Sequence, residues 1–524
     1  MQKRKRFGLA LAGLALTSLL AQAAPAAAAD QPQAPAAGQP SLDASQRLWQ
    51  DESIYFVFLD RFHDGDKSND AGTNPADPRG WHGGDIQGVT DKLDYIKSMG
   101  FTAIWITPFV KNDGNDYHGY GATDFFQVDP HFGTLAQLKE LVNQAHARGM
   151  KVLFDVVVNH TGPNSPLTVQ HPDWFHPNKP ISDWNNAQNV QNGWLYNLPD
   201  FDQSNPAVRD YILSYSKYWI EQTGVDGFRL DTVRHVAPDF WTWYNAQLQQ
   251  IKPGFWLIGE VFDNSAYKLP LWQNAGVTAL LDFPDDAAAR SVFGQDAMMT
   301  NLSETVRQVA DAMPNPYEMG AFLDNHDMTR FVSNAKQDDP VGRLKLGLEW
   351  LFTQRSIPIM YYGTEVAMPG KDDPDNRHDF PWENPQHTDV RDLITRLNAI
   401  RQAHLALRRG SITTLAVTGN DYAYARVAGN DKVVVVLNND GKNALAKSYN
   451  VSALGLKDGT TLRDELTGAE VTVAGGQLPA QVGPRTAAIY VVTVSKTAKA
   501  VSGIVMALLV VVPVGLIRFL RRRR

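Results

Sequence analysis

Short hydrophobic runs alternate with longer amphipathic stretches through most of the chain. The short runs are rich in Val, Ile, Phe and Tyr, which favours strands, whereas the stretches between them repeat apolar residues at helical spacing. Strands are expected at residues 54–59, 102–107, 152–158, 225–230, 255–258, 277–281, 321–323 and 357–361. The clearest helices are expected at residues 135–148, 208–222, 239–250, 302–313 and 341–353, and the last barrel helix at about 390–407. This alternation over roughly 350 residues predicts an α/β fold, a (β/α)8 TIM barrel. A doubly wound open sheet is the alternative, but no G-x-G-x-x-G motif opens a helix here.

The alternation is interrupted once and stops before the C-terminus. Residues 159–205 contain many Asn, Pro, Trp and His residues, and a loop of this length inside a barrel indicates a small inserted domain, domain B, after the third strand. Residues 409–495 hold β-rich runs separated by Gly, Asn and Asp turns, which is typical of an antiparallel β-sandwich. We therefore expect a catalytic barrel over residues 50–408 and a C-terminal β-sandwich domain after it.

Both ends of the chain carry patterns of membrane targeting. Basic residues at 3–6 precede an apolar run and an Ala-rich stretch, so residues 1–29 are expected to be a secretory signal peptide, with a retained anchor as the alternative. Residues 30–49 are rich in Ala, Pro and Gln and indicate a linker. An apolar run followed by arginines predicts a C-terminal transmembrane anchor at residues 501–520, or a sorting tail that is later removed. We expect an exported protein of the extracellular space or cell envelope, attached to the membrane through this tail.

The amino-acid composition excludes several kinds of binding partner and catalytic chemistry. The chain has 524 residues, 43% of them hydrophobic, which is enough for a large core. The net charge of −7 gives no general attraction to nucleic acid. The sequence contains no cysteine, which excludes disulfides, thiol catalysis and cysteine-ligated metals.

Acids and histidines follow four of the predicted strands. Active sites of (β/α)8 enzymes lie at the C-terminal ends of the strands, so these side chains are expected on one rim. Singly, each acid is as well explained by a cap or a structural ion pair. Three acids and two histidines at the same end of one barrel are much harder to explain in that way. The residues are Asp231, Glu260 and Asp327, with His160 and His326 beside them.

The fourth strand carries Arg229 two residues before Asp231, so both side chains project from the same face. The cation would hold the carboxylate ionised and oriented, as a nucleophile requires. Retaining glycoside hydrolysis needs a second carboxyl group about 5–5.5 Å away, which Glu260 on the neighbouring strand can supply.

Seven short stretches then carry a family resemblance. In order they are residues 100–108 (GFTAIWITP), 155–160 (DVVVNH), 198–202 (LPDFD), 227–235 (GFRLDTVRH), 259–261 (GEV), 322–327 (FLDNHD) and 357–365 (IPIMYYGTE). With these the chain resembles the α-amylase family, glycoside hydrolase family 13, from residue 53 to about residue 492.

The resemblance implies roles for individual residues. Asp231 would be the nucleophile, Glu260 the general acid/base, and Asp327 the third acid, which binds hydroxyls of the reacting sugar. Two residues after the eighth strand, Asp375 and Arg377, would contact the next sugar, unless they belong to a surface turn. The other substrate-binding residues implied are His118, Tyr120, His160, Arg229, Arg234, His235 and His326.

The resemblance also implies calcium as a cofactor. Asn159, Asp200 and the carbonyl of His235 match the family's site between barrel and inserted domain. A second cluster resembles the additional calcium site of cyclodextrin glucanotransferases, with a solvated acidic turn as the alternative. Its members are Asp64, Asp66, Asn69, Asp70, Gly83 and Asp85. An EF-hand is rejected, because the twelfth loop position is Pro75 rather than Glu.

The expected activity is that of an exported retaining α-amylase acting on α-1,4-glucosidic bonds of starch, glycogen or maltooligosaccharides. The alternatives are a cyclomaltodextrinase, a maltogenic amylase or a 4-α-glucanotransferase, since Tyr196 sits where cyclodextrin glucanotransferases carry a central aromatic residue. Gly121 stands where Trp is common in the family and removes one stacking wall. A non-catalytic relative is a remote alternative, against which the intact acid trio argues.

Overall fold

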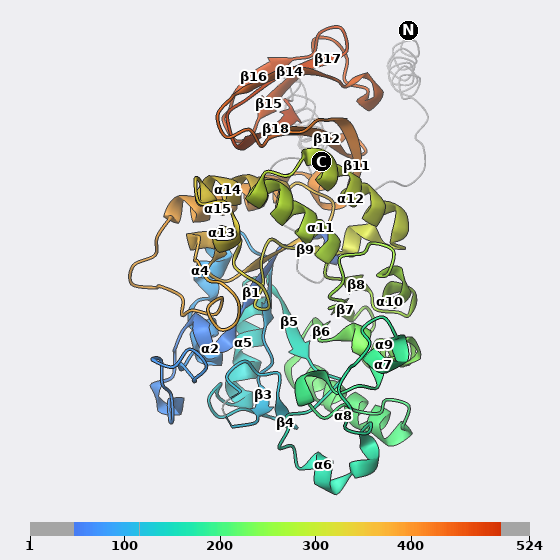
Figure 1. Ribbon diagram of the computed structural model, residues 1–524. Helices are drawn as coiled ribbons and strands as arrows, with labels where there is room; N and C mark the ends of the chain where they lie inside the picture. The colour runs from blue at the N-terminus through green and yellow to red at the C-terminus, as the bar shows by residue number, and fades with distance from the viewer. Residues whose placement is uncertain (1–46, 115, 494–524) are drawn as a thin grey trace, which may run out of the picture.

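The computed structural model describes residues 47–114 and 116–493, which form a barrel and a C-terminal sheet domain (Figure 1). The predicted signal peptide and C-terminal anchor lie outside these residues. None of the helices in the described part of the chain is long and apolar enough to cross a membrane. The barrel strands are β1 (Ile54–Val57), β2 (Ala103–Ile106), β5 (Lys151–Val156), β6 (Gly227–Leu230), β7 (Trp256–Gly259), β8 (Ala279–Leu280), β9 (Gly320–Ala321) and β10 (Ile357–Tyr361).

The eight strands form one sheet in the order β8-β7-β6-β5-β2-β1-β10-β9, and the paired strands run parallel. The two ends of this sheet meet through a bridge between Leu281 and Gly320, where Asp282 N donates to Gly320 O at 2.8 Å. The sheet therefore curls into a nearly closed barrel, which confirms the predicted fold class.

Helices follow the strands and cover the barrel. α5 begins with a capping box of Thr134 and Gln137, and α8 begins with the Asn205 cap and Pro206 and ends at Gly224, which adopts φ 73°. The predicted helix over 390–407 is broken at His404, whose extended backbone separates two helices. The helices around the barrel are α2 (Leu59–Phe62), α3 (Ile86–Asp91), α4 (Leu93–Ser98), α5 (Leu135–Ala147), α8 (Pro206–Thr223), α9 (Pro238–Ile251), α10 (Pro270–Asn274), α11 (Phe283–Ala289), α12 (Met299–Ala312), α13 (Phe331–Asn334), α14 (Pro340–Leu351), α15 (Thr388–Ala403) and α16 (Leu405–Arg409).

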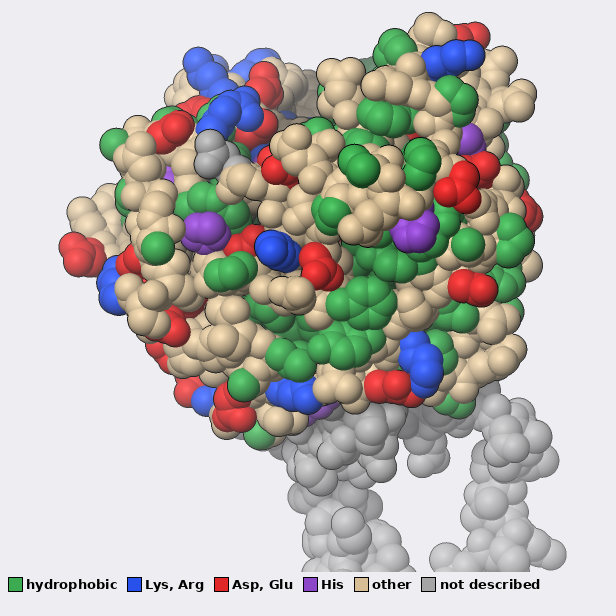
Figure 2. All heavy atoms as spheres, turned by 90° about the horizontal axis from the view of Figure 1, so that it is seen from below, with side chains coloured by type: hydrophobic (Ala, Val, Ile, Leu, Met, Phe, Trp, Pro, Cys, Tyr) green, Lys and Arg blue, Asp and Glu red, His purple; other side chains and the backbone are tan. Residues whose placement is uncertain are grey.

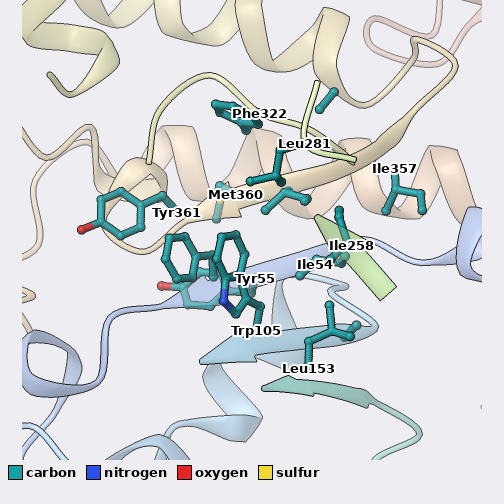
Figure 3. Packing of buried hydrophobic residues seen from close by; sticks show 14 of the residues in the cluster. Ile54, Tyr55, Trp105, Leu153, Ile258, Leu281, Phe322, Ile357, Met360 and Tyr361 are labelled. Atoms are coloured by element: carbon teal, nitrogen blue, oxygen red, sulfur yellow. The ribbon is translucent and has the colours of Figure 1, made fainter. Parts of the chain in front are cut away.

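The barrel core consists of side chains from strands that are buried along their whole length. Figure 3 shows Ile54, Trp105, Leu153 and Ile258, from four strands, gathered in this cluster. Trp105 also stacks on Phe56, with ring centroids 3.6 Å apart. A core packed in this way gives the residues at the strand ends a rigid base.

Two insertions stand on the same end of the barrel. After β2, the strands β3 (Val110–Asn112) and β4 (Ala122–Val128) form a hairpin. After β5, residues 159–205 carry the short helices α6 (Leu167–Gln170) and α7 (Ala187–Gln191). Isolated bridges join His160 to Asp200 and Phe175 to Phe201, so this segment folds back onto the end of the third barrel strand.

The C-terminal domain is antiparallel, as expected, and has its own apolar cluster. It docks on the barrel through α14, where Glu349 Oε2 accepts from Ala487 N at 2.7 Å. Arg426 adds a donor bond of 2.8 Å to Thr353 O. The strands are β11 (Ser411–Val417), β12 (Asp421–Ala428), β13 (Asp431–Asn438), β14 (Leu445–Asn450), β15 (Thr461–Asp464), β16 (Glu470–Thr472), β17 (Gln477–Val482) and β18 (Thr486–Val492).

Candidate active site

The three candidate acids stand at or just beyond the C-terminal ends of barrel strands. Asp231 directly follows β6 and its backbone N–H donates to Val156 O at 3.1 Å. Glu260 directly follows β7 and donates to Leu230 O at 2.9 Å. Asp327 lies in the loop after β9. Because sheet hydrogen bonding continues into Asp231 and Glu260, their backbones are fixed relative to each other.

A single guanidinium links two of these acids. Arg229 is fully buried, and its Nη1 donates to Asp231 Oδ1 at 2.8 Å. Its Nη2 lies 3.0 Å from Glu260 Oε1, without the alignment of a hydrogen bond. Two carboxyl groups that contact one guanidinium are held side by side, which is compatible with the spacing of about 5–5.5 Å used in retaining hydrolysis.

Burial decides the protonation of Glu260. Desolvation raises the pKa of Glu260 to about 8, although Arg229 opposes the shift, and the charges of Asp231 and Asp327 add to it. Thr232 N donates to Glu260 Oε2 at 3.1 Å and fixes the other side of the carboxyl group. A carboxyl group with this pKa carries its proton at neutral pH and can act as a general acid.

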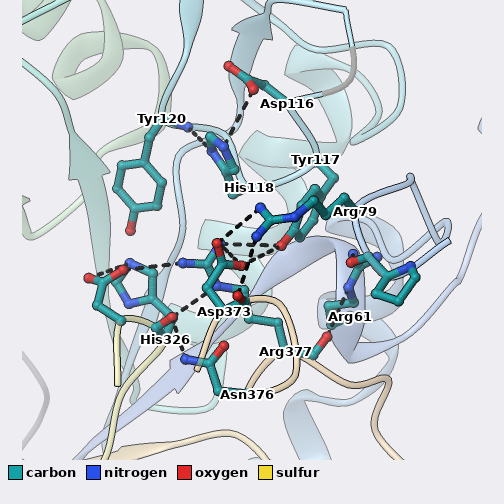
Figure 4. A network of polar contacts seen from close by, with 12 residues as sticks. Arg61, Arg79, Asp116, Tyr117, His118, Tyr120, His326, Asp373, Asn376 and Arg377 are labelled. Atoms are coloured by element: carbon teal, nitrogen blue, oxygen red, sulfur yellow. Dashed lines mark hydrogen bonds and ion pairs between the residues drawn. The ribbon is translucent and has the colours of Figure 1, made fainter. Parts of the chain in front are cut away.

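Asp327 has its own set of contacts. Arg377 Nη2 lies 3.3 Å from its Oδ1, and His326 Nε2 lies 3.2 Å from its Oδ2. The His326 carbonyl accepts from Arg377 Nε at 2.9 Å and from Asn376 Nδ2 at 2.8 Å, a network drawn in Figure 4. Burial raises the pKa of Asp327, and Arg377 lowers it. The loop after β10 thus holds the loop that carries Asp327 through the carbonyl group of His326.

A cleft of about 580 Å³ opens over Glu260 and Asp327. Asp231 is not among its lining residues; its side chain, which is 8% exposed like that of Glu260, is held by Arg229. The lining residues are Trp184, Leu195, Tyr196, Thr232, Arg234, His235, Glu260, Phe262, Asp327, Asp373 and Arg377. This set combines acids, cations and aromatic rings, as a carbohydrate site requires.

The other residues predicted to bind substrate fall into two groups. Tyr120 stacks on His326 with ring centroids 5.3 Å apart, and its N–H donates to His118 Nδ1 at 3.1 Å. His160 is buried next to Asn159, whose Nδ2 lies 3.3 Å from His160 Nδ1. None of these four substrate-binding candidates lines the cleft, although Tyr120 lies next to Arg229, whose guanidinium carbon is 5.8 Å from its ring centroid. Arg234 and His235 do line the cleft.

Asp375 is not brought into the cleft. Its carboxylate accepts from Lys371 N at 2.7 Å and pairs with His378 at 2.9 Å, within its own loop. The acid of this loop that lines the cleft is Asp373, which contacts Arg377 Nη1 at 3.1 Å. Asp373, two residues earlier, thus lines the cleft where Asp375 was predicted to do so.

Several site residues were missed by sequence reasoning. Asp155 on β5 pairs with Arg229, and Trp184 and Phe262 line the cleft with exposures of 49% and 48%. A signal for Asp155 was present in the sequence, since this acid lies near the end of β5, the strand next to β6. The two aromatic residues lie in loops where nothing in the local pattern distinguishes them.

The first predicted calcium cluster presents free oxygens. Asn159 Oδ1 and Asp200 Oδ1 are buried and have no hydrogen-bond partner among the described residues. Asp200 Oδ2 is held by His176 Nδ1 at 2.7 Å, which leaves the other oxygen to face Asn159 across the bridge at His160. Buried oxygens without partners are destabilising unless a cation or water binds them, so this cluster fits a calcium ion.

The second predicted cluster divides into ligands and supports. Asp64, Asn69 and Asp70 each have a buried oxygen without a hydrogen-bond partner in the described chain. A Cβ on Gly83 would lie 2.7 Å from Asp70 Oδ1, so only glycine permits this approach. Lys67 forms an ion pair with Asp64 and reaches Asp70 at 4.0 Å, which shows that the cluster attracts a cation.

Asp85 and Asp66 hold that turn instead. Asp85 accepts from the N–H groups of Gly65, Asp66 and Gly88, and Asp66 accepts from Ser68 and Gln137. Across residues 47–114 and 116–493, no group of three or more His, Asp or Glu side chains is arranged to hold a metal ion. Both clusters instead combine at most two acids with an amide, so their fit to calcium depends on Asn and backbone oxygens.

Comparison with known proteins places this geometry in a family. The α-amylase catalytic domain matches residues 56–403. An Anoxybacillus α-amylase structure is 41% identical, with a TM-score of 0.83, over 86% of this chain and 100% of that chain. An α-amylase from Geobacillus thermoleovorans, solved in complex with acarbose, is 39% identical with a TM-score of 0.82 over the same shares.

Curated relatives carry related names. The β/α-amylase of Paenibacillus polymyxa is 36% identical over 465 residues, which are 84% of this chain but only 38% of that protein. The chain thus spans well under half the length of that relative. Cyclomaltodextrinases and cyclomaltodextrin glucanotransferases also match.

Proposed function

The chain belongs to the α-amylase family of α-glucan-cleaving glycoside hydrolases, and from this premise we propose that it is an α-amylase. It hydrolyses α-1,4-glucosidic bonds of starch, glycogen or maltooligosaccharides with retention of configuration. The observation that supports this proposal most directly is the Arg229 guanidinium, which contacts both Asp231 and Glu260 while burial keeps Glu260 protonated. That arrangement supplies an anionic nucleophile and a proton donor side by side.

The proposed reaction takes two displacements. Asp231 attacks the anomeric carbon as Glu260 transfers its proton to the leaving glycosidic oxygen, which gives a covalent glycosyl–Asp231 ester. Glu260, now ionised, removes a proton from water, and the water oxygen displaces Asp231 from the same carbon. Asp327 accepts hydrogen bonds from hydroxyls of the reacting sugar, while Arg377 and His326 fix its carboxylate.

Similarity favours α-amylase over the transferases. Two solved α-amylases are matched over their full length at 39% and 41% identity. One observation favours a glucanotransferase or cyclomaltodextrinase as the second candidate. Tyr196 is 85% exposed, adopts φ 50° and lines the cleft, so its ring is presented where a glucan could wrap around it.

Calcium is proposed as a structural cofactor. Asn159, Asp200 and the His235 carbonyl would hold one ion, and Asp64, Asn69, Asp70 and the Gly83 backbone a second, with Asp66 and Asp85 shaping that turn. A bound cation neutralises the buried carboxylates and joins segments that are distant in the chain. No step of the reaction requires it.

Export and membrane attachment are proposed from the sequence alone. The basic, apolar and Ala-rich order of residues 1–29 supports secretion, and the apolar run at 501–520 supports a membrane anchor or sorting tail. The enzyme would then act on glucans outside the cytoplasm.

The activity is tested by substitution of Glu260 and by product analysis. Glu260→Gln should abolish starch hydrolysis while circular dichroism stays unchanged, and the exposed Glu470→Gln serves as the matched control. Linear maltooligosaccharides from starch in the α-anomeric form, with cyclodextrins left intact, would support a retaining α-amylase. Cyclodextrins formed or consumed faster than starch would favour the second candidate, and full activity in Glu260→Gln would refute the mechanism.

A further inference from the structure

Exposed hydrophobic side chains are concentrated along one path on this protein. The described residues include eight large hydrophobic side chains that are exposed to solvent. Five of them line the catalytic cleft or a second cleft next to it: Trp184, Tyr196, Phe262, Tyr267 and Leu271. Exposed apolar side chains that gather in two adjoining clefts indicate a binding surface rather than random surface composition.

The second cleft, which we call the distal groove, has a volume of about 340 Å³ and lies between α7 and α10. It shares Trp184 and Arg234 with the catalytic cleft. Arg234 donates to Phe262 O and to Trp184 O, each at 3.2 Å, and so joins the two loops that separate the clefts. The distal groove therefore adjoins the catalytic cleft, and Trp184 and Arg234 form the boundary that the two share.

The lining of the distal groove combines apolar faces with polar rims. Val190, Val261 and Trp272 are buried beneath it, whereas Tyr267 and Leu271 are 71% and 52% exposed at its edge. The polar lining residues are Asn185, Gln191, Asp263 and Lys268.

The charges of the distal groove are already paired. Asp263 Oδ2 lies 3.0 Å from Lys268 Nζ and 3.9 Å from Arg234 Nη1. Figure 2 shows a face of the molecule where hydrophobic side chains gather in the middle and acidic and basic ones lie scattered. Paired charges beside exposed aromatic rings favour an uncharged ligand with both apolar faces and hydroxyl groups.

We propose that the distal groove binds the α-glucan chain beyond the catalytic cleft, an inference that rests on the proposed function. A sugar ring packs its C–H face on Tyr267 and Leu271, and its hydroxyls bond to Asn185, Gln191 and Asp263. Arg234 and His235 border the leaving-group side by resemblance, so the groove holds the part of the chain that departs. Long glucans are then bound more tightly than short ones, and product length depends on this surface.

Kinetics on substrates of different length test this proposal. Tyr267→Ala and Leu271→Ala are compared with Met298→Ala, which removes an equally exposed apolar side chain (58%) from outside the two clefts. The ratio of KM for soluble starch to KM for maltotriose should rise by roughly five- to tenfold in Tyr267→Ala. Tyr267→Phe keeps the ring and should restore the wild-type ratio, and Met298→Ala should not change it.

Binding measurements separate failure of this proposal from failure of the proposed activity. Glu260→Gln is titrated with maltoheptaose while tryptophan fluorescence is recorded, with and without Tyr267→Ala. Weaker binding in the double variant supports the groove even if the wild type hydrolyses no glucan. An unchanged KM ratio together with unchanged maltoheptaose binding overturns the proposal. A changed oligomeric state in Tyr267→Ala without any change in KM also overturns it, because the groove would then be a contact between copies.

Discussion

Asp155 on β5 and Arg229 on β6 are direct partners across two parallel strands, and Arg229 Nη1 lies 2.9 Å from Asp155 Oδ1. Trp105 Nε1 and Tyr120 OH also donate to Asp155, at 3.1 and 2.8 Å. Burial raises the pKa of Asp155 to about 7 and the charge of Asp231 adds to this shift, whereas Arg229 and Tyr120 oppose it by stabilising the carboxylate. Asp155 therefore positions the guanidinium on which Asp231 and Glu260 depend.

Asp155→Asn should impair catalysis more than binding. The amide keeps the shape of the carboxylate but loses its negative charge. The charge of the fully buried Arg229 is then only partly neutralised by the acids around it. We expect kcat to fall by roughly 10- to 100-fold with little change in KM, and the free energy of unfolding to fall by about 3 kcal/mol. Steady-state kinetics and urea unfolding measure both effects.

The matched control is Asp94→Asn. Asp94 pairs with Arg148 at 2.7 Å, but its side chain is 78% exposed, so solvent screens the pair and its loss should change the free energy of unfolding much less than Asp155→Asn does. If Asp155→Asn and Asp94→Asn changed kcat and the free energy of unfolding equally, the buried Asp155–Arg229 pair would not position the active site.

The pH–rate profile should have an alkaline limb near pH 8. The pKa of Glu260 is raised to about 8, so the acid form needed for protonation of the leaving oxygen is present below that pH and lost above it. Well above pH 8, kcat/KM should fall about tenfold for each further pH unit. Recovery of activity on return to pH 7 distinguishes titration from denaturation. A rate that stays constant to pH 9.5 would contradict the assignment of Glu260 as general acid.

Calcium removal should lower thermal stability. If calcium binds only the folded chain at a concentration about 100 times its Kd, its removal lowers the free energy of unfolding by about 2.7 kcal/mol. Asp200→Asn and Asp70→Asn should each lose one ion in metal analysis, and each should reduce the Tm difference between calcium and chelator. Asp173→Asn, an exposed acid in the inserted segment, is the control. Unchanged metal content in both variants would argue against these ligands.

Glu349→Gln should stabilise the protein at alkaline pH. Burial at the barrel–sheet junction raises the pKa of Glu349 to about 8 from 4.5, so the folded state favours the protonated carboxyl group. The stability that this group contributes is fully present below pH 4.5 and is lost as the pH rises through about 8.

A glutamine in this place does not titrate and still presents an oxygen to Ala487 N. The free energy of unfolding of Glu349→Gln, relative to wild type, should therefore rise between pH 5 and pH 8. Urea unfolding at both pH values measures the difference. A difference that does not depend on pH would show that Glu349 is not desolvated.

Much of the barrel could be predicted because each strand is marked by the hydrophobicity of its own few residues. Each barrel strand is buried along its whole length, so uninterrupted apolar runs such as residues 357–361 identified strands directly. The broken helix at His404 could not be predicted, since the apolar spacing continues across it and only the extended backbone at that residue separates α15 from α16.

Site residues that follow barrel strands could be predicted from the sequence, whereas site residues in long loops could be predicted less well. Asp231 and Glu260 follow strands, and their positions come from sheet geometry. Asp373 and Asp375 share a loop without periodicity, so the pattern did not show which of them faces the cleft. Gly121 was expected to leave a stacking wall open, but a Cβ there would lie 1.6 Å from Asp116 Oδ2, so the Asp116 carboxylate already fills that space.

The seam between β8 and β9 has a consequence for the dynamics of the barrel. These two strands are only two residues each, and the Leu281–Gly320 bridge joins them. Behind the seam, Arg355 reaches Asp282 and Asp285 at 3.2 and 2.9 Å, which are side-chain contacts rather than backbone ladders. Amide protons along this edge are therefore protected by few cooperative bonds, and they should exchange with deuterium before those of β1, β2 and β5. We therefore expect local opening of the barrel to begin between β8 and β9.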